Sequence, residues 1–191
     1  MWMASPGERV RGLTTAITTI AADMPTFRSI LPSDGPALVR FHEALSADAQ
    51  RSRFFAVHPH LTATEVDRFS HVDHLDREAI IVTVGTEIIA VGRYDRIPSS
   101  GRAEVAFVTA EGHRGGGLAT QLLARLAAAA QAVGVVEFVA QTLPENRRML
   151  GVFTRSPFKT VTASAAGSSR SRCCSRPPSA PMPRCSRDAR G

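Results

Sequence analysis

Long apolar runs, cysteine and lysine are all scarce in this sequence. No uninterrupted apolar stretch approaches the roughly 20 residues that a membrane-spanning helix requires. The best candidate, residues 122–140, is interrupted by Arg125, Gln131 and Glu137. Residues 1–25 place two arginines ahead of a weakly apolar stretch, as a signal peptide does, but threonines dilute that stretch. We therefore expect a cytoplasmic protein with no membrane partner.

The three cysteines, Cys173, Cys174 and Cys185, do not form the C-x-x-C spacing of a metal site or a redox pair. Histidines form two short motifs, residues 58–60 and 71–74, but no further ligand motif accompanies them. Such histidines are better interpreted as loop and surface residues. The sequence therefore predicts no metal site, and a chain of 191 residues can bury a sizeable core without one.

Lysine occurs only at Lys159, so nearly all of the basic charge is arginine. The formal net charge is +6, but residues 163–191 carry six arginines against one aspartate and leave the rest of the sequence nearly neutral. A nucleic-acid-binding protein typically gathers its positive charge on a folded face rather than in one terminal segment. We therefore expect no nucleic-acid partner.

Residues 163–191 contain no Ile, Leu, Val or aromatic residue. A segment of this composition cannot bury enough apolar surface to offset the entropy of ordering it, so we predict a disordered tail. Such a sequence also arises when GC-rich DNA is read out of frame, and a frameshifted C-terminus is an alternative interpretation. The predicted organisation is an N-terminal extension over residues 1–24, one folded domain over residues 25–162, and the tail.

The folded region alternates helical and strand patterns. The helical patterns are residues 36–45, residues 61–70, a long helix from the glycine cluster to Val133, and a helix that begins at Pro144. The strand patterns are a hairpin over residues 78–97 that turns at Gly85, a strand over 102–110, and a strand over 135–143. Ser33 or Asp34 is expected to cap the first helix, and Thr62 or Thr64 the second. This order predicts an α/β fold with a mixed central sheet flanked by helices.

Three consecutive glycines, Gly115 to Gly117, stand where the third strand leads into the long helix. Glycines at a helix N-terminus expose backbone N–H groups, and the helix dipole adds positive potential, so the junction suits a pyrophosphate. A P-loop is disfavoured because Leu118 and Ala119 occupy the positions of its Lys and Ser/Thr. A Rossmann fingerprint is disfavoured because Thr120 stands where its third glycine belongs.

The junction reads R-G-G-G-L-A and resembles the acyl-CoA-binding signature Arg/Gln-x-x-Gly-x-Gly/Ala of GNAT-superfamily acetyltransferases. A second segment, N-R-R-M-L-G-V-F-T-R-S-P-F, is similar to that family's Asn-led helix, with Asn146 and Phe158 at matching positions. The order of elements is similar too, and the resemblance covers residues 25–158. It implies a GNAT-like sheet and acetyl-CoA as co-substrate.

Three segments are similar to the catalytic domain of Pat-type bacterial protein lysine acetyltransferases: A-L-S-A-D-A-Q-R-S-R-F-F, A-E-V-A-F-V and L-P-E-N-R-R-M-L-G-V-F. In that group the domain can be attached to a cyclic-nucleotide-binding or acyl-CoA-synthetase module. Residues 1–24 are too few to encode either module, so we expect any such regulation to act in trans.

The resemblance implies a role for each matching residue. Glu104 matches the general-base glutamate of Pat-type enzymes, which takes a proton from the acceptor ammonium. Glu104 lies in an apolar run that suggests burial; its alternatives are a solvent-facing position or a pair with Arg93. Phe107 and Val108 would pair with the pantetheine arm, and Asn146 would bond the cofactor near its thioester. The amides that would hold the pyrophosphate belong to Arg114, Gly115, Gly116, Gly117, Leu118, Ala119 and Thr120.

Two positions depart from the family pattern. Phe153 stands where many members have a tyrosine that protonates the leaving thiolate, so the thiolate would leave unassisted or take its proton from water. Pro157 occupies the position of a glycine. The family closes its sheet with two more strands, whereas the sequence after Phe158 predicts at most one, which would expose a sheet edge on the acceptor side.

Two functions are consistent with these patterns. The first is an N-acetyltransferase that moves an acetyl group from acetyl-CoA to a protein lysine, which the Pat resemblance favours, or to a small amine. The second is a non-catalytic acyl-CoA-binding or interaction protein, or the inactive product of a frameshifted gene. Turnover distinguishes the two.

Overall fold

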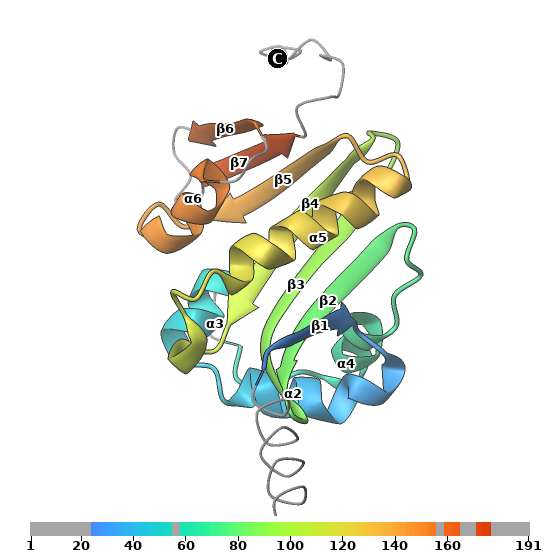
Figure 1. The fold of residues 1–191 in the computed structure, drawn as a ribbon, viewed down its shortest axis with the longest axis vertical. Coiled ribbons are helices and arrows are strands. Elements are labelled where there is room, and N and C mark those ends of the chain that lie inside the picture. The colour runs from blue at the N-terminus through green and yellow to red at the C-terminus, as the bar shows by residue number, and fades with distance from the viewer. Residues whose placement is uncertain (1–23, 55–57, 156–158, 165–170, 177–191) are drawn as a thin grey trace, which may run out of the picture.

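The protein is described by a computed structural model that covers residues 24–54, 58–155, 159–164 and 171–176. A seven-stranded sheet in the order β1-β2-β3-β4-β5-β7-β6 forms its centre (Figure 1). Neighbouring strands are antiparallel except for β4 and β5, which are parallel. The strands are β1 (Thr26–Ser29), β2 (Arg77–Val84), β3 (Glu87–Ile97), β4 (Arg102–Thr109), β5 (Glu137–Thr142), β6 (Lys159–Ser164) and β7 (Ser171–Arg176).

Helices flank this sheet, which confirms the predicted α/β fold. They are α2 (Gly35–Glu43), α3 (Ala47–Phe54), α4 (Ala63–Ser70), α5 (Leu118–Ala132) and α6 (Arg147–Thr154), with short 3-10 turns η1 (Pro32–Asp34) and η2 (Glu111–His113). Among the described residues, no helix combines the length and the hydropathy of a membrane span.

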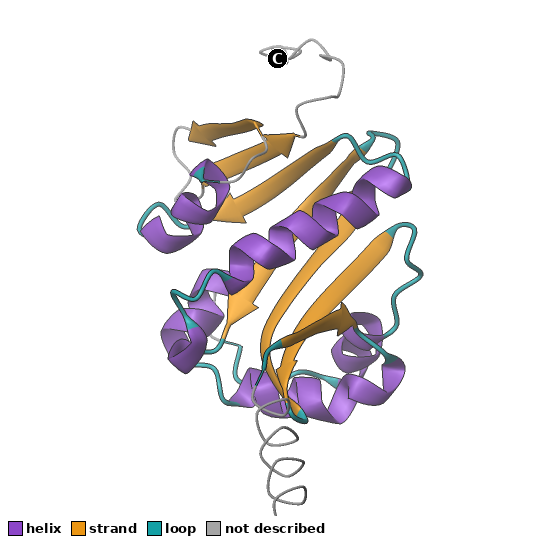
Figure 2. Cartoon of the chain, viewed as in Figure 1, coloured by secondary structure: helices purple, strands orange, loops and turns teal. Residues whose placement is uncertain are grey.

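Each face of the sheet has its own apolar core. The long helix α5 lies across one face (Figure 2), where Ile80 of β2 belongs to the same buried cluster as Leu122 of α5. On the other face, Ile81 shares a second cluster with Phe41 of α2. Successive residues of a strand point to opposite faces, so the apolar run of β2 supplies both cores. The two cores hold β3 and β4 rigidly behind the site described below.

Several local signals in the sequence are confirmed by the backbone. Thr62 caps α4 in a capping box: its hydroxyl accepts from the Glu65 amide at 3.2 Å, and a Glu65 carboxylate oxygen accepts from the Thr62 amide at 2.8 Å. Gly85 turns the hairpin between β2 and β3 with φ 57°, and Gly134 follows α5 with φ 81°. Both glycines adopt the left-handed conformation, as expected of a tight turn and a helix end.

Three elements differ from the sequence prediction. Strand β1 and helix α3 were not predicted, because β1 is only four residues long and α3 is a polar segment that buries little beyond Ala49 and Gln50. Helix α6 begins at Arg147 rather than at Pro144. The Asn146 side chain caps it by accepting from the Met149 amide at 3.1 Å, which sets the start of the helix three residues later.

The C-terminal strands correct the prediction that at most one strand follows Phe158. Strands β6 and β7 pair with each other, and β7 pairs with β5, so the acceptor side of the sheet continues past β5. Strand pairing is made by backbone groups, so a segment without large apolar side chains can still extend a sheet edge. The end of β6 and the whole of β7 fall within residues 163–191, and the disorder of this tail stays a prediction. Residues 156–158, 165–170 and 177–191, with Pro157, Phe158 and Cys185, lie outside the described residues.

Candidate active site

A cavity of about 700 Å³ opens where β4 and β5 separate. The two strands are paired only from Arg102 to Glu104 on β4 and from Glu137 to Val139 on β5. Beyond these residues, Val105–Thr109 and Ala140–Thr142 both line the cavity. Strand β4 is still paired with β3 on its other side, so its open edge presents unpaired backbone groups toward the gap. Such an edge can accept an extended ligand as an additional strand.

The glycine junction forms one end of this cavity. Gly115 and Gly117 adopt positive φ angles of 87° and 77°, and Gly117 is the N-cap residue of α5. The first hydrogen bond of the helix runs from the Gln121 amide to the Gly117 carbonyl at 3.0 Å. No acceptor among the described residues bonds the six consecutive amides of residues 115–120. An array of free amides at a helix N-terminus is an anion site.

The side chains beside the glycines are engaged with their own loop. Arg114 donates from Nε to the Thr109 carbonyl at 3.4 Å and forms an ion pair with Glu111 at 3.4 Å. The Ser46 hydroxyl also donates to Glu111, at 2.5 Å. Because Ser46 immediately precedes α3, this bond anchors the start of α3 to the glycine loop. An anion at this end would therefore meet backbone amides rather than a free arginine side chain.

Glu104 lies at the closed end of the cavity, where β4 and β5 begin to separate. Its neighbours Ala103 and Val105 are buried against α5, whereas Glu104 is exposed on the opposite face of the strand. This corrects the expectation of burial, because the apolar residues around Glu104 belong to the other face. No hydrogen bond or ion pair joins its carboxylate to any described residue.

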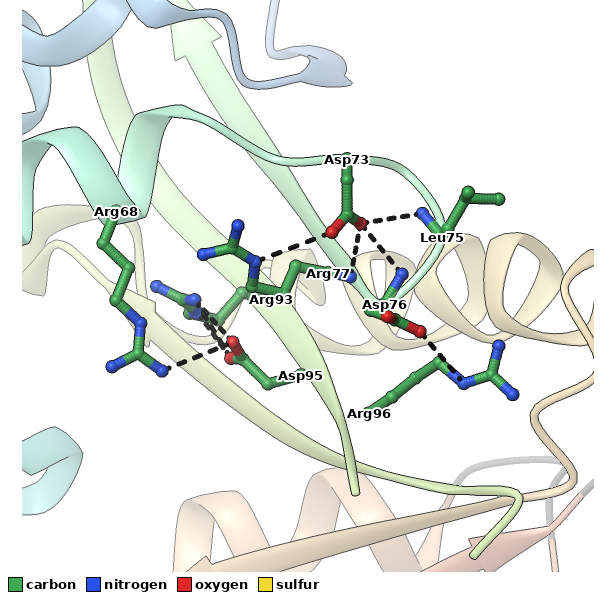
Figure 3. Close-up of polar contacts among 8 residues, drawn as sticks. All are labelled: Arg68, Asp73, Leu75, Asp76, Arg77, Arg93, Asp95 and Arg96. Atoms are coloured by element: carbon green, nitrogen blue, oxygen red, sulfur yellow. Dashed lines mark hydrogen bonds and ion pairs between the residues drawn. The ribbon is translucent and has the colours of Figure 1, made fainter. Parts of the chain in front are cut away.

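Arg93 does not pair with Glu104, because it is bonded to Asp95. The Arg93 guanidinium donates two hydrogen bonds to the Asp95 carboxylate, both at 3.0 Å, and stacks 4.6 Å above the Phe69 ring. Arg68 of α4 reaches the same carboxylate at 3.7 Å (Figure 3). Asp95 is the cross-strand neighbour of Glu104. Arg93 and Arg68 are thus both paired with Asp95, the neighbour of Glu104, and neither forms a hydrogen bond or an ion pair with the Glu104 carboxylate.

Figure 3 also shows the turn that leads into β2, with Arg96 of β3 beside it. One oxygen of Asp73 accepts from the amides of Leu75, Asp76 and Arg77 at 2.8 to 3.0 Å (Figure 3). Asp76 in turn lies 3.6 Å from Arg96 on β3. These contacts satisfy the backbone of the turn, so we assign them a structural role.

Arg53, at the C-terminal end of α3, interacts electrostatically with Glu104. It lines the cavity, and its guanidinium lies 4.9 Å above the Phe54 ring. Burial, together with repulsion from Arg93, lowers the pKa of Arg53 to about 10, and attraction by Asp95 and Glu104 opposes this shift. No described residue forms a hydrogen bond or an ion pair with its side chain.

Helix α6 closes the cavity on the β5 side. Asn146 lines it and uses its oxygen to cap the helix, so its amide nitrogen is left as a donor. Phe153 also lines the cavity but is only 1% exposed, and its ring lies 6.2 Å from that of Phe107. The wall on this side is therefore an aromatic surface at its base and a polar amide at its edge.

Nearly all of the predicted cofactor residues meet at this one cavity. Those that line it are Phe107, Val108, Arg114, Gly115, Gly117, Leu118, Ala119, Thr120 and Asn146. Gly116 does not line the cavity, although its backbone amide is free. Glu104 does not line it either, and immediately precedes Val105, the first residue of β4 that does. The sequence prediction missed the contribution of α3, namely Asp48, Ala49, Ser52 and Arg53, and two arginines, Arg148 of α6 and Arg155, which follows that helix. The one signal for α3 in the sequence was its segment of Pat resemblance, which carried no assigned role.

The histidines of the two motifs lie beside carboxylates. His58 lies 3.1 Å from Glu65, His71 lies 3.0 Å from Asp67, and other carboxylates neighbour His60 and His74. Within the part of the chain that the structure describes, no group of three or more His, Cys, Asp or Glu side chains could hold a metal ion.

Comparison with known proteins identifies the family. The model of the acetyltransferase (GNAT) family matches residues 40–157. The GNAT domain of Streptomyces lividans Pat is similar at 35% identity and a TM-score of 0.74, over 78% of this chain and 89% of that one. A putative acetyltransferase from Salmonella typhimurium, solved with its cofactor acetyl-CoA, shares the fold at 15% identity and a TM-score of 0.63, over 79% and 91% of the two chains. A cAMP-binding acyltransferase from Mycobacterium smegmatis also shares the fold, at 24% identity and a TM-score of 0.55, over 81% of this chain and 44% of that one.

The residues of this chain fit acetyl-CoA. Six free amides suit its pyrophosphate, and the open edge of β4 suits the extended pantetheine arm. The family model covers more than half of the sequence and includes the whole of the β4–α5 junction and α6. The chain therefore belongs to the GNAT family and is an acetyltransferase that uses acetyl-CoA as co-substrate.

Proposed function

We propose that this acetyltransferase modifies a lysine side chain of another protein, with Glu104 as the general base. The position of Glu104 carries this proposal. It is the last residue of β4 that pairs with β5, it immediately precedes Val105, the first residue of β4 that lines the cavity, and no described residue forms a hydrogen bond or an ion pair with its carboxylate. The resemblance to Pat-type enzymes supports lysine as the acceptor.

The cofactor would be held by three parts of the chain. The amides of residues 115–120 would donate to the pyrophosphate, where the dipole of α5 adds to their effect. Phe107 and Val108 would pair with the pantetheine arm through the open edge of β4. The amide nitrogen of Asn146 would donate near the thioester end. These proposed roles are distributed along one cavity, so the acyl group would point toward Glu104.

Glu104 would prepare the acceptor for attack. A lysine amine is protonated near neutral pH, and its nitrogen has no lone pair to offer until a base takes one proton. Glu104 is exposed and unpaired, so an ammonium group can approach it from solvent. Transfer of that proton to Glu104 would leave a neutral amine beside the acyl end of the cavity.

The test is a comparison of acceptor classes with the full-length chain. Peptides with a single internal lysine, the same peptides with the lysine already acetylated, and a panel of small amines are each incubated with acetyl-CoA. Thiol release and mass spectrometry report turnover and the site of modification. We expect one acetyl group on the lysine of the unmodified peptides and none on the blocked ones.

Two other outcomes would contradict the proposal in different ways. Acetylation of small amines alone would retain the acetyltransferase and remove lysine as the acceptor. Binding of acetyl-CoA without thiol release from any acceptor would favour the non-catalytic alternative.

A further inference from the structure

The chemistry of acetyl transfer leaves a negative charge that the family's usual donor cannot neutralise here. Breaking the carbon–sulfur bond gives the sulfur an electron pair, and a thiolate in a partly desolvated cavity needs a proton or a cation. The chain contains a single tyrosine, Tyr94. Tyr94 is fully buried on β3, does not line the cavity, and has its pKa raised to about 12 by burial. No tyrosine is therefore placed to protonate the sulfur, and Phe153 has no proton to give.

Arg53 is the cation at the end of the cavity where the sulfur would lie. Helix α3 is anchored beside the glycine loop by the Ser46–Glu111 hydrogen bond, and it runs along the cavity to Arg53. At that end Arg53 interacts electrostatically with Glu104, which marks the closed end of the cavity. The glycine end binds the pyrophosphate, so the opposite end, next to Arg53, is the acyl end.

The other arginines of the lining are placed differently. Arg114 is paired with Glu111 in the glycine loop, and Arg148 of α6 and Arg155, which follows α6, are exposed. Arg53 is partly buried and forms no hydrogen bond or ion pair with a described residue, although Asp95 and Glu104 attract it. A partly buried guanidinium without a bonded partner is stabilised when an anion forms beside it. A guanidinium donates strong hydrogen bonds to anions and is not itself a proton source near neutral pH.

We propose that Arg53 contacts the sulfur of the acyl-CoA and stabilises the CoA thiolate as it leaves, in place of a proton donor. This inference rests on the proposed function. The acceptor nitrogen forms its bond to the acyl carbon, and its proton passes to Glu104. The carbon–sulfur bond breaks, and the sulfur retains the electron pair as a thiolate beside Arg53. Water protonates that thiolate after it leaves, so no further co-reactant is required.

The first test does not depend on turnover. The thiol of CoA bound to the full-length chain is titrated through the ultraviolet absorbance of its thiolate, and the result is compared with CoA in solution. A neighbouring cation favours the charged form, so the pKa of the bound thiol should be lower by about one unit or more. A bound thiol that titrates like free CoA in the wild-type protein would overturn the proposal without any variant.

Variants separate Arg53 from the rest of the site. Arg53→Met should return the pKa of the bound thiol to that of free CoA or above, and Arg53→Lys should give an intermediate value. Arg51→Met is the matched control, because Arg51 lies on the same helix, is exposed, and pairs with Asp48 at 3.7 Å. The control should titrate like the wild type. An unchanged pKa in Arg53→Met would overturn the proposal, and Arg53→Lys provides the same test if the Met variant does not fold.

Kinetics with an accepted acceptor then distinguish a direct role from an indirect one. Arg53→Met should lower kcat by about 100-fold, the scale of losing one stabilising donor, while the KM for acetyl-CoA changes less than about threefold. The acidic limb of the pH profile of kcat/KM should lie at the same pH in Arg53→Met as in the wild type. Movement of that limb with an unchanged thiol pKa would mean that Arg53 acts through Glu104, which contradicts the proposal. If no acceptor is found, the proposed function fails while the thiol titration still decides the role of Arg53.

Discussion

The two ends of the cavity recognise charge by different means. At the glycine end, six backbone amides are free and the arginine side chain is paired with Glu111 in its own loop. At the closed end, the charged groups are the side chains of Glu104 and Arg53, and neither is bonded to a described residue. Backbone groups at a helix start are fixed by the fold, which suits the binding of a constant cofactor group. Side chains can change charge or position during a reaction, which suits the chemical step.

The largest expected effect is at the closed end. Glu104→Gln removes the proposed base and keeps the size of the side chain, so kcat should fall by about 100- to 10,000-fold. Binding of acetyl-CoA should be nearly unchanged, because the amides lie at the other end. Steady-state kinetics and isothermal titration calorimetry measure the two quantities. Equal loss of activity and binding would remove Glu104 from the base role.

The next effect is at the glycine end. Gly117→Ala forces an L-residue into φ 77°, and relaxation of this strain should displace the amides and weaken acetyl-CoA binding by about tenfold or more. Gly134→Ala is the matched control, because Gly134 has φ 81° and a Cβ atom at either glycine would meet nothing within 4 Å. Both variants should lose a similar amount of stability, and only Gly117→Ala should lose affinity in equilibrium dialysis. Equal affinity in the two would mean that the junction is only a turn.

The wall between the two ends depends on the buried face of β4. A Cβ atom at Gly92 would lie 2.9 Å from a ring carbon of Phe107 and 3.1 Å from Leu126. Gly92→Ala should therefore lower the free energy of unfolding by about 1–3 kcal/mol through overpacking. Gly112→Ala, where a Cβ atom would meet nothing within 4 Å, should have little effect. Equal thermal stability of the two variants would show that Phe107 is not tightly packed beneath the site.

The smallest effect concerns the link between the ends. Ser46→Ala removes the hydrogen bond to Glu111 and a second bond that the Ser46 hydroxyl accepts from the Ala49 amide at 3.2 Å. Two such bonds at a partly exposed position contribute about 1 kcal/mol to stability. Denaturant unfolding should detect this loss, together with a small increase in the KM for acetyl-CoA. A wild-type KM in a variant of reduced stability would show that the anchor of α3 does not position the site.

The two ends also differ in how far the sequence could predict them. Gly115 to Gly117 could be assigned because a strand, a glycine cluster and a helical pattern are local in sequence. The positive φ angles of Gly115 and Gly117 also favour glycine. Arg53 could not be assigned, because α3 has no apolar period and its approach to Glu104 depends on how the helix packs on β4. The face of Glu104 was misjudged for a related reason. An apolar strand covered on both faces gives no alternation that would show which face a charged residue occupies.

The C-terminal strands show the same limit. Hydrophobic pattern predicts elements that bury side chains, and β7, the strand that the sequence prediction missed, lacks that pattern. Its pairing with β5 and β6 continues a backbone ladder instead.

Thermal unfolding of the full-length chain with and without acetyl-CoA tests the central claim most directly, namely that the opening between β4 and β5 is the acetyl-CoA site. Acetyl-CoA at about 100 times its dissociation constant should add about 2.7 kcal/mol to the free energy of unfolding. For a domain of this size that raises Tm by several degrees. A cooperative transition that acetyl-CoA does not shift would contradict the claim.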